Sequence, residues 1–132
     1  MKQLVVVRDF MSQPVLTVDS EASVAEACRL MGDKHVGSIL VSRKGVAKAI
    51  FTERDLLSKV LPEKKDLAKI TVGAYASSPL VTVAGRTDVK EAARIMTQMK
   101  VRRLVVVQDG QPIGIFTAAD LAKATGKSPL EI

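Results

Sequence analysis

The hydrophobic pattern of this chain repeats itself after 65 residues. Residues 7–56 align with residues 72–121 without a gap, and 18 of the 50 paired positions are identical. A duplication of this size predicts one supersecondary unit that buries its apolar face with the help of its own copy. Any site that one copy carries is then expected in both.

Each copy opens with a short extended segment and an amphipathic helix. Residues 14–18 and 79–83 are rich in β-branched side chains, which predicts strands. Ser23-x-x-Glu26 and Asp88-x-x-Glu91 have the form of a capping box or its acidic variant, so a helix is expected to begin there. Apolar residues then recur at i, i+3, i+4 and i+7, at Val24, Ala27, Cys28 and Met31 and at Val89, Ala92, Ala93 and Met96. This spacing predicts one buried helical face.

A hairpin and a second helix complete each copy. Residues 36–42 and 46–52 form one pair of apolar runs, and residues 101–107 and 111–117 form the other. The second pair turns at Asp109-Gly110, a strong hairpin signal, and the first turns at Lys44-Gly45, a weaker one. The predicted fold is therefore α+β, with two tandem βαββα repeats packed with pseudo-two-fold symmetry. Its predicted divisions are a first repeat (7–60), a charged connector (61–71), a second repeat (72–125) and a C-terminal tail (126–132).

Composition narrows the class of protein. The 132 residues are 47% hydrophobic and 26% charged, as in a soluble globular domain. The longest apolar run has four residues, whereas a membrane-spanning helix needs about 20, and we expect no signal peptide. The one cysteine, Cys28, cannot form an internal disulfide, so a cytoplasmic location is predicted. Its place in the buried stripe indicates a packing role.

The net charge of +6 favours anionic partners such as nucleotides, nucleic acid or an acidic protein surface. A solvated lysine-rich surface without a specific partner explains the same charge. With three Phe, one Tyr and no Trp, the chain has too few aromatic side chains to predict stacking platforms for single-stranded nucleic acid.

The strongest local signal is Thr52-Glu-Arg-Asp55 and its counterpart Thr117-Ala-Ala-Asp120, each at a predicted strand-to-helix turn. A threonine at a helix N-terminus can hold a phosphate oxygen. An aspartate three residues later can accept hydrogen bonds from the two vicinal hydroxyls of a ribose. The same pattern is also that of a capping box, which explains it without a ligand.

Catalytic and metal chemistry find little support in the sequence. His35 has no nearby Cys or His to complete a zinc site, and we expect no metal. No Ser–His–acid set or matched pair of carboxylates is recognisable. We therefore predict a protein without enzymatic activity and without a cofactor.

Over residues 7–125 the chain resembles a tandem pair of cystathionine-β-synthase (CBS) domains, also called a Bateman module. The resemblance rests on motifs from both copies, whose order and spacing are specific when taken together. These are Met11-Ser-x-Pro14, Ala27-Cys-Arg-Leu-Met31, His35-Val-Gly-Ser-Ile-Leu-Val41, Val101-Arg-Arg-Leu-Val-Val-Val107 and Gly114-Ile-Phe-Thr-Ala-Ala-Asp-Leu121.

The resemblance implies two adenosyl-ligand sites, each combining a Thr–Asp pair with an adenine slot borrowed from the other repeat. In the family pattern the hydroxyl contacts phosphate and the Asp contacts ribose. The first implied site consists of Thr117, Asp120, Met11, Leu16 and Val36. The second consists of Thr52, Asp55, Ala76, Val81 and Val101, with Arg102 and Arg103 as phosphate contacts or, alternatively, as a solvated basic edge.

The two implied sites differ at the glycine of the family pattern. The second copy has Gly114, whereas the first has Ala49, which would narrow its site if the backbone must approach the ligand. Four basic residues, Lys48, Arg54, Arg102 and Arg103, would make that same site more electropositive. We expect both sites to bind.

The predicted function is a non-enzymatic regulatory module. It is expected to bind an adenine nucleotide (AMP, ADP or ATP) or S-adenosylmethionine between the repeats and to signal to a client protein. The resemblance also implies a homodimer. The alternative is a basic scaffold that binds protein or nucleic acid and whose nucleotide sites are vestigial.

Overall fold

The computed structural model describes residues 4–126, which form two compact units. Among the described residues, the first-repeat unit is Leu16–Leu80, and the second-repeat unit combines residues 4–15 with residues 81–126. Each unit contains one three-stranded sheet.

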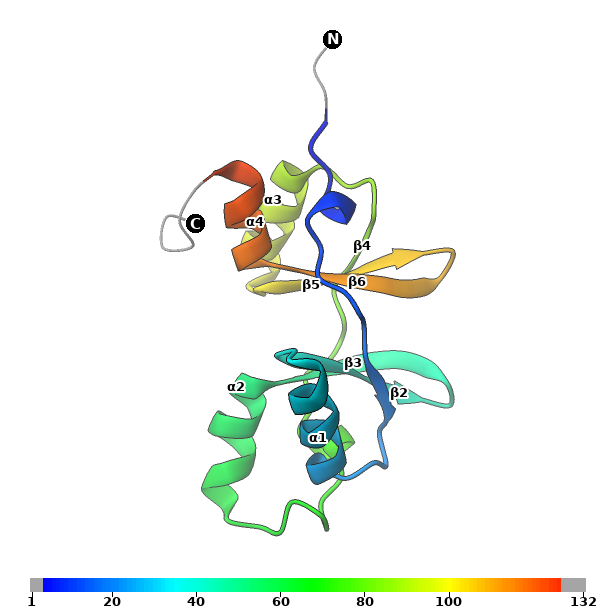
Figure 1. Cartoon of the computed structure of the whole chain (residues 1–132), viewed down its shortest axis with the longest axis vertical. Helices are drawn as coiled ribbons and strands as arrows, with labels where there is room; N and C mark the ends of the chain where they lie inside the picture. The colour runs from blue at the N-terminus through cyan, green and yellow to red at the C-terminus, as the bar shows by residue number, and fades with distance from the viewer. Residues whose placement is uncertain (1–3, 127–132) are drawn as a thin grey trace. The chain divides into compact units, whose positions relative to one another are not determined.

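In the first-repeat unit, β1 (Thr17–Asp19) leads into α1 (Val24–Lys34) and the hairpin β2 (Ser38–Arg43) and β3 (Val46–Thr52). The strand order is β1-β2-β3, with β1 parallel to β2 and β2 antiparallel to β3. The chain then forms α2 (Glu53–Asp55), a π-helical turn η2 (Leu56–Val60) and a 3-10 turn η3 (Leu61–Glu63). Figure 1 shows α1 and α2 on the same side of this sheet.

The second-repeat unit follows the same plan. Its elements are β4 (Thr82–Ala84), α3 (Val89–Met99), β5 (Arg103–Gln108), β6 (Gln111–Thr117) and α4 (Ala118–Thr125). The strand order is β4-β5-β6, with β4 parallel to β5 and β5 antiparallel to β6. Helices α3 and α4 lie together on one side of the sheet (Figure 1). The predicted α+β class with two βαββα units is confirmed.

Both first helices begin and both hairpins turn where the sequence predicts, but the two caps differ. Asp88 caps α3 by accepting from the Lys90 amide at 2.7 Å and not from the Glu91 amide of the expected box. The backbone amide of Glu26 donates to Ser23 Oγ at 3.0 Å, which caps α1. In the two hairpins, Lys44 and Asp109 have φ values of 50° and 51°, and each is followed by a glycine with φ of 78°. Two successive positive φ values define the tight turn that matches the twist of antiparallel strands, which is why glycine follows in both copies.

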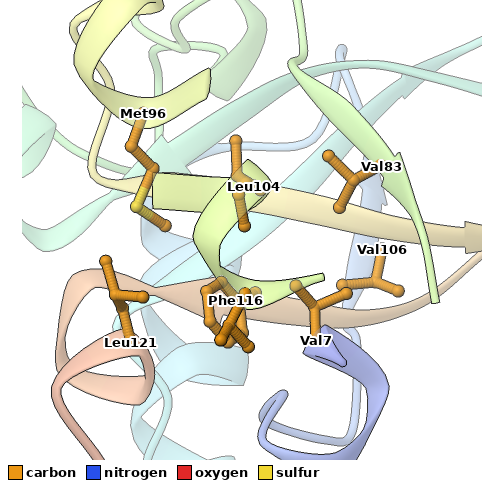
Figure 2. Close-up of a cluster of buried hydrophobic side chains, with 9 residues drawn as sticks. Val7, Val83, Met96, Leu104, Val106, Phe116 and Leu121 are labelled. Carbon is orange, nitrogen blue, oxygen red and sulfur yellow. The ribbon is translucent and has the colours of Figure 1, made fainter. Parts of the chain in front are cut away.

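Each unit has its own apolar core between helices and sheet. In the first-repeat unit the buried residues include Val24, Ala27 and Met31 of α1, facing Ile39 and Phe51 of the sheet. The second-repeat core, drawn in Figure 2, consists of Val7, Val83, Val89, Ala92, Met96, Leu104, Val106, Phe116 and Leu121. The helical stripes predicted from the sequence supply much of the buried surface, although Cys28 and Ala93 are only partly buried at its edge.

The segment before each repeat's first strand belongs to the other repeat's unit. The 3-10 turn η1 (Val7–Asp9) joins the second-repeat unit, where the Val7 amide donates to Thr87 O at 2.9 Å. Its counterpart η4 (Val72–Ala74) joins the first-repeat unit, where the Val72 amide donates to Ala22 O at 2.8 Å. The compact units are therefore divided at different points from the sequence repeats.

Residues 61–71, the predicted connector, contact the start of α1 and the first-repeat core. The Ala25 amide donates to Leu67 O and the Val24 amide to Ile70 O, both at 3.0 Å, so this segment supplies acceptors for the first turn of α1. The side chains of Leu67 and Ile70 pack against the first-repeat core. The predicted tail begins at Gly126, the C-cap of α4, and residues 127–132 lie outside the described residues. No helix within residues 4–126 has the length and apolarity to cross a membrane.

Candidate functional site

Both Thr–Asp pairs form capping boxes at the junction of the hairpin and the following helix. Thr52 is the N-cap of α2 and Thr117 is the N-cap of α4. The amides of Asp55 and Asp120 donate to the hydroxyls of Thr52 and Thr117 at 3.1 and 3.2 Å. In return, each carboxylate accepts a hydrogen bond from the threonine amide. The capping-box explanation therefore holds for both Thr–Asp pairs. A ligand would have to bind carboxylate or hydroxyl atoms that the capping box leaves without a partner.

Asp120 keeps one carboxylate oxygen available. The residue is only 5% exposed, and its Oδ2 accepts from the Thr117 amide at 2.9 Å. Within residues 4–126, Oδ1 has no hydrogen-bond partner, yet no fully buried side-chain oxygen there lacks one. Oδ1 must therefore be in contact with solvent. A fixed carboxylate with one open oxygen is suited to accept hydrogen bonds from a hydroxylated ligand.

Asp55, by contrast, is surrounded by donors. Its Oδ2 accepts from the amide and from the hydroxyl of Thr52, at 3.0 and 3.2 Å. Its Oδ1 accepts from Ser77 Oγ at 3.3 Å and pairs with Lys59 Nζ at 3.0 Å. Residue identity is the same in the two copies, but the surroundings of the carboxylate are not.

The residue opposite each threonine also differs. Arg103 of β5 pairs with Thr117 of β6, whereas Ser38 of β2 pairs with Thr52 of β3. Directly opposed residues of antiparallel strands have their Cβ atoms about 5 Å apart on the same face. Arg103 is thus the neighbour of Thr117. The sequence grouped this arginine with Thr52, which lies in the other unit.

A groove lies beside the C-terminal end of the first helix in each unit. The α1 groove has a volume of about 460 Å³ and is lined by Cys28, Met31, Gly32, His35, Val36, Glu53 and Leu56. The α3 groove has a volume of about 260 Å³ and is lined by Met96, Thr97, Lys100, Val101, Arg102 and Ala118. Two cations line the α3 groove, whereas the α1 groove is lined by the carboxylate of Glu53 and by His35. The α3 groove is consequently the better match for an anion.

Met11 explains the glycine at position 114. The amides of Ser12 and Ile115 exchange hydrogen bonds of 2.8 and 3.1 Å, which places residue 11 against β6. A Cβ atom on Gly114 would overlap Met11 Sδ and lie 2.7 Å from its Cγ. In the first-repeat unit the corresponding residues are Ala49 and Ala76, so a small side chain replaces methionine where alanine replaces glycine. A larger residue at one position of the pair is thus matched by a smaller residue at the other. Packing within the unit therefore explains Gly114 without a ligand.

The residues of each implied site are distributed over both units. For the first site, Thr117, Asp120 and Met11 lie in the second-repeat unit, and Leu16 and Val36 lie in the first-repeat unit. For the second site, Thr52, Asp55 and Ala76 lie in the first-repeat unit, and Val81, Val101, Arg102 and Arg103 lie in the second. Leu16 and Val81 have equivalent places, because each carbonyl accepts a bond from the neighbouring strand, from the amides of Leu40 and Val105.

Sequence reasoning missed Lys59 and Ser77, the two side chains that contact Asp55 Oδ1. The signal was present in the repeat alignment, where Lys59 corresponds to Ala124 although both aspartates are retained. A charged residue four positions after a retained aspartate, in one copy only, indicates that the two copies use that aspartate differently.

Cys28 and His35 have local structural explanations. Burial raises the pKa of the Cys28 thiol, so the thiolate is disfavoured. His35 is the C-cap of α1 with φ of 55°, and its amide donates to Gly32 O at 3.2 Å. The part of the chain that the structure describes holds no group of three or more His, Cys, Asp or Glu side chains suited to a metal ion.

Comparison with known proteins places the chain in one family. The family model for the CBS domain matches twice, over residues 7–62 and 72–127. The CBS domain-containing protein YhcV of Bacillus subtilis is 32% identical over 116 residues, which cover 88% of this chain and 82% of YhcV. The uncharacterized protein MJ0450 of Methanocaldococcus jannaschii is also 32% identical over 116 residues, but the match spans 62% of its length.

Solved structures show the same architecture. A candidate signal-transduction protein with CBS domains from Burkholderia ambifaria superposes with a TM-score of 0.79 at 26% identity, covering 91% of this chain and 93% of that one. The hexameric CBS-CP12 protein from bloom-forming cyanobacteria gives a TM-score of 0.82 at 28% identity, covering 91% of this chain and 67% of that one.

Proposed function

The chain belongs to the CBS domain family as a tandem pair, and from this premise we propose that it is a regulatory module that binds an adenosyl ligand. The observation that carries the proposal is Asp120, a residue that is only 5% exposed yet keeps its carboxylate oxygen Oδ1 without a partner among the described residues. The 2′ and 3′ hydroxyls of a ribose supply two donors to such an oxygen pair. Hydrogen bonds to a charged acceptor are the stronger class.

A phosphate finds donors close to the same carboxylate. In residues 4–126 the Thr117 hydroxyl accepts a bond from the Asp120 amide but has no acceptor of its own, so its hydrogen is available to a ligand. Arg103 is its cross-strand neighbour, and a guanidinium binds phosphate with two parallel hydrogen bonds. The N-terminal end of α4 adds the favourable end of a helix dipole.

The adenine slot follows from the family resemblance. Met11 would line it as part of the second-repeat unit, and Leu16 and Val36 would line it as part of the first-repeat unit. Three apolar side chains suit a planar base, whose faces are apolar. For the second implied site the corresponding residues are Ala76, Val81 and Val101.

The module acts by binding rather than by catalysis. A ligand changes the output of such a module only if it binds two arrangements of the protein with different affinity. We propose that the ligand shifts the packing of the repeats, or of a homodimer, and that a client protein recognises the shifted form. No cofactor takes part, and the adenosyl compound is the regulatory signal.

A thermal-shift panel tests the proposal. Purified protein is heated with AMP, ADP, ATP, NAD or S-adenosylmethionine at about 150 mM salt, where exposed charges are largely screened beyond about 8 Å. A ligand at a hundredfold excess over its Kd stabilises the native state by about 2.7 kcal/mol, which raises Tm by several degrees. We expect at least one compound to do so.

Asp120→Asn is the matched variant. Its amide oxygen still accepts from the Thr117 amide, so the cap is retained, but its amide nitrogen cannot accept a ribose hydroxyl. We expect Tm without ligand to change little and the ligand-induced shift to be lost. An unchanged shift in Asp120→Asn would contradict the role given to this residue.

The competing function is the basic scaffold that the charge of +6 supports. Binding to nucleic acid through phosphate contacts weakens steeply between about 50 and 200 mM salt. If the protein binds none of the five adenosyl compounds but binds double- or single-stranded nucleic acid with that salt dependence, the scaffold function is correct.

A further inference from the structure

The two aspartates differ in how many hydrogen bonds they already accept. Asp55 accepts two at Oδ2, both from Thr52, and one at Oδ1, from Ser77, and its Oδ1 also forms an ion pair with Lys59. Asp120 accepts one, from the Thr117 amide, among the residues that the structure describes. A ribose needs acceptor capacity that Asp120 has and Asp55 has used within its own unit.

Among the described residues, Lys59 is the one side chain in contact with Asp55 that has no counterpart of the same residue type at the equivalent position of the other copy. Its Nζ lies 3.0 Å from Asp55 Oδ1, 3.1 Å from Ser77 Oγ and 3.5 Å from Tyr75 O. The ammonium group therefore sits among three acceptors, on the oxygen that corresponds to the open Oδ1 of Asp120. In the second repeat the equivalent position is Ala124, which has no charge and no donor on its side chain.

The backbone differs at the same place. Lys59 lies in the π-helical turn η2 (Leu56–Val60), where the second repeat continues as the regular helix α4 (Ala118–Thr125). Turns of π-helix are rare and are often found at functional sites. The side-chain and backbone differences between the copies thus coincide at one position.

We propose that the Lys59 ammonium occupies the ribose position of the first-repeat site, so that the module binds one adenosyl ligand per chain, at Asp120. This inference rests on the proposed function and narrows it. It replaces the expectation of two competent sites. The Thr52 hydroxyl donates to Asp55 Oδ2, so the phosphate contact expected there is also engaged. The counterpart of Arg103 is Ser38, which offers no cation.

A second role for Lys59 makes a different prediction. Its contacts with Tyr75 and Ser77 join the helix after β3 to the segment that completes the first-repeat sheet. If Lys59 only stabilises the packing of that segment, substituting Lys59 lowers the stability of the protein and leaves the number of bound ligands unchanged. If it fills the ribose position, removing it adds a site.

The test is binding stoichiometry by isothermal titration with AMP and, separately, with S-adenosylmethionine. We expect one equivalent per chain for the unmodified protein and two for Lys59→Ala, which copies the second repeat at that position. Lys59→Gln removes the charge while keeping a long side chain, and it should give the same result if the alanine variant is poorly folded. Ala124→Lys is the reciprocal variant, and we expect it to weaken binding at Asp120 by at least about tenfold, which is 1.4 kcal/mol.

The outcomes separate this inference from the proposed function. Two equivalents in the unmodified protein, or one equivalent in both Lys59 variants, would overturn the role of Lys59 while leaving nucleotide binding in place. No binding of either probe by the unmodified protein and all three variants would overturn the proposed function, and the inference with it. Circular dichroism of each variant confirms that the titrated protein is folded.

Discussion

Gly114 and Met11 form a pair in which each residue type depends on the other. Met11 lies across β6 where a side chain at position 114 would begin, with its Cγ 2.7 Å from an added Cβ. The first-repeat unit has Ala49 and Ala76 at the equivalent positions. At the residue scale, the departure from the family glycine at position 49 is therefore a packing exchange within one unit. It does not by itself argue that the first-repeat site is narrowed.

We expect Gly114→Ala to destabilise the protein by about 1–3 kcal/mol, because the added methyl group overpacks the contact with Met11. The double variant Gly114→Ala with Met11→Ala reproduces the alanine pair of the first-repeat unit. It should recover most of the lost free energy of unfolding. Urea unfolding of the wild type, both single variants and the double variant gives the coupling free energy. Purely additive effects would show that the two side chains do not compete for space.

At the level of helices and strands, the sequence predicts features that depend on residues a few positions apart, such as helix caps and hairpin turns. The cap at Ser23 and the Asp109–Gly110 turn involve residues within a few positions of one another, and both are found as expected. The π-helical turn at Leu56–Val60 was not predicted. Lys59 in that turn contacts Tyr75 and Ser77, 16 and 18 residues away, and such contacts leave no local pattern.

The candidate site was predictable to the same extent. Thr117 and Asp120 are three residues apart, so their association at a helix start follows from spacing alone. The pairing of Arg103 with Thr117 required the register of the hairpin, and the open oxygen of Asp120 required its surroundings. Spacing in the sequence therefore indicates the Thr–Asp pairs, whereas three-dimensional contacts are needed to distinguish the surroundings of one pair from those of the other.

At the scale of the whole molecule, the repeats exchange their leading segments. Val7 is fully buried in the second-repeat core beside Phe116 and Val106, as Figure 2 shows. Val72, its counterpart in the sequence, is fully buried in the first-repeat core. Each unit therefore depends on a segment that lies next to the other unit in the chain, so neither sequence repeat alone holds all the residues of its unit.

Val7→Ala and Val72→Ala should weaken opposite units. Each substitution removes buried methyl groups and is expected to cost about 1–3 kcal/mol. Native-state hydrogen exchange locates the loss. We expect faster exchange in α3 and β5 for Val7→Ala, and in α1 and β2 for Val72→Ala. Faster exchange of α1 in Val7→Ala, with α3 unaffected, would mean that residues 7–12 belong to their own repeat.

An adenosyl site at Asp120 is tested most directly by an amide chemical-shift titration of isotopically labelled protein. The five adenosyl compounds are added in turn at about 150 mM salt, which screens exposed charges. If Asp120 holds the ribose, saturable shifts are expected for the amides of Arg103 and of residues 117–121, while the amides of residues 52–55 stay near their starting positions. Shifts at neither Thr–Asp pair with any compound, or shifts spread over basic surface residues and abolished by added salt, would contradict a site at Asp120.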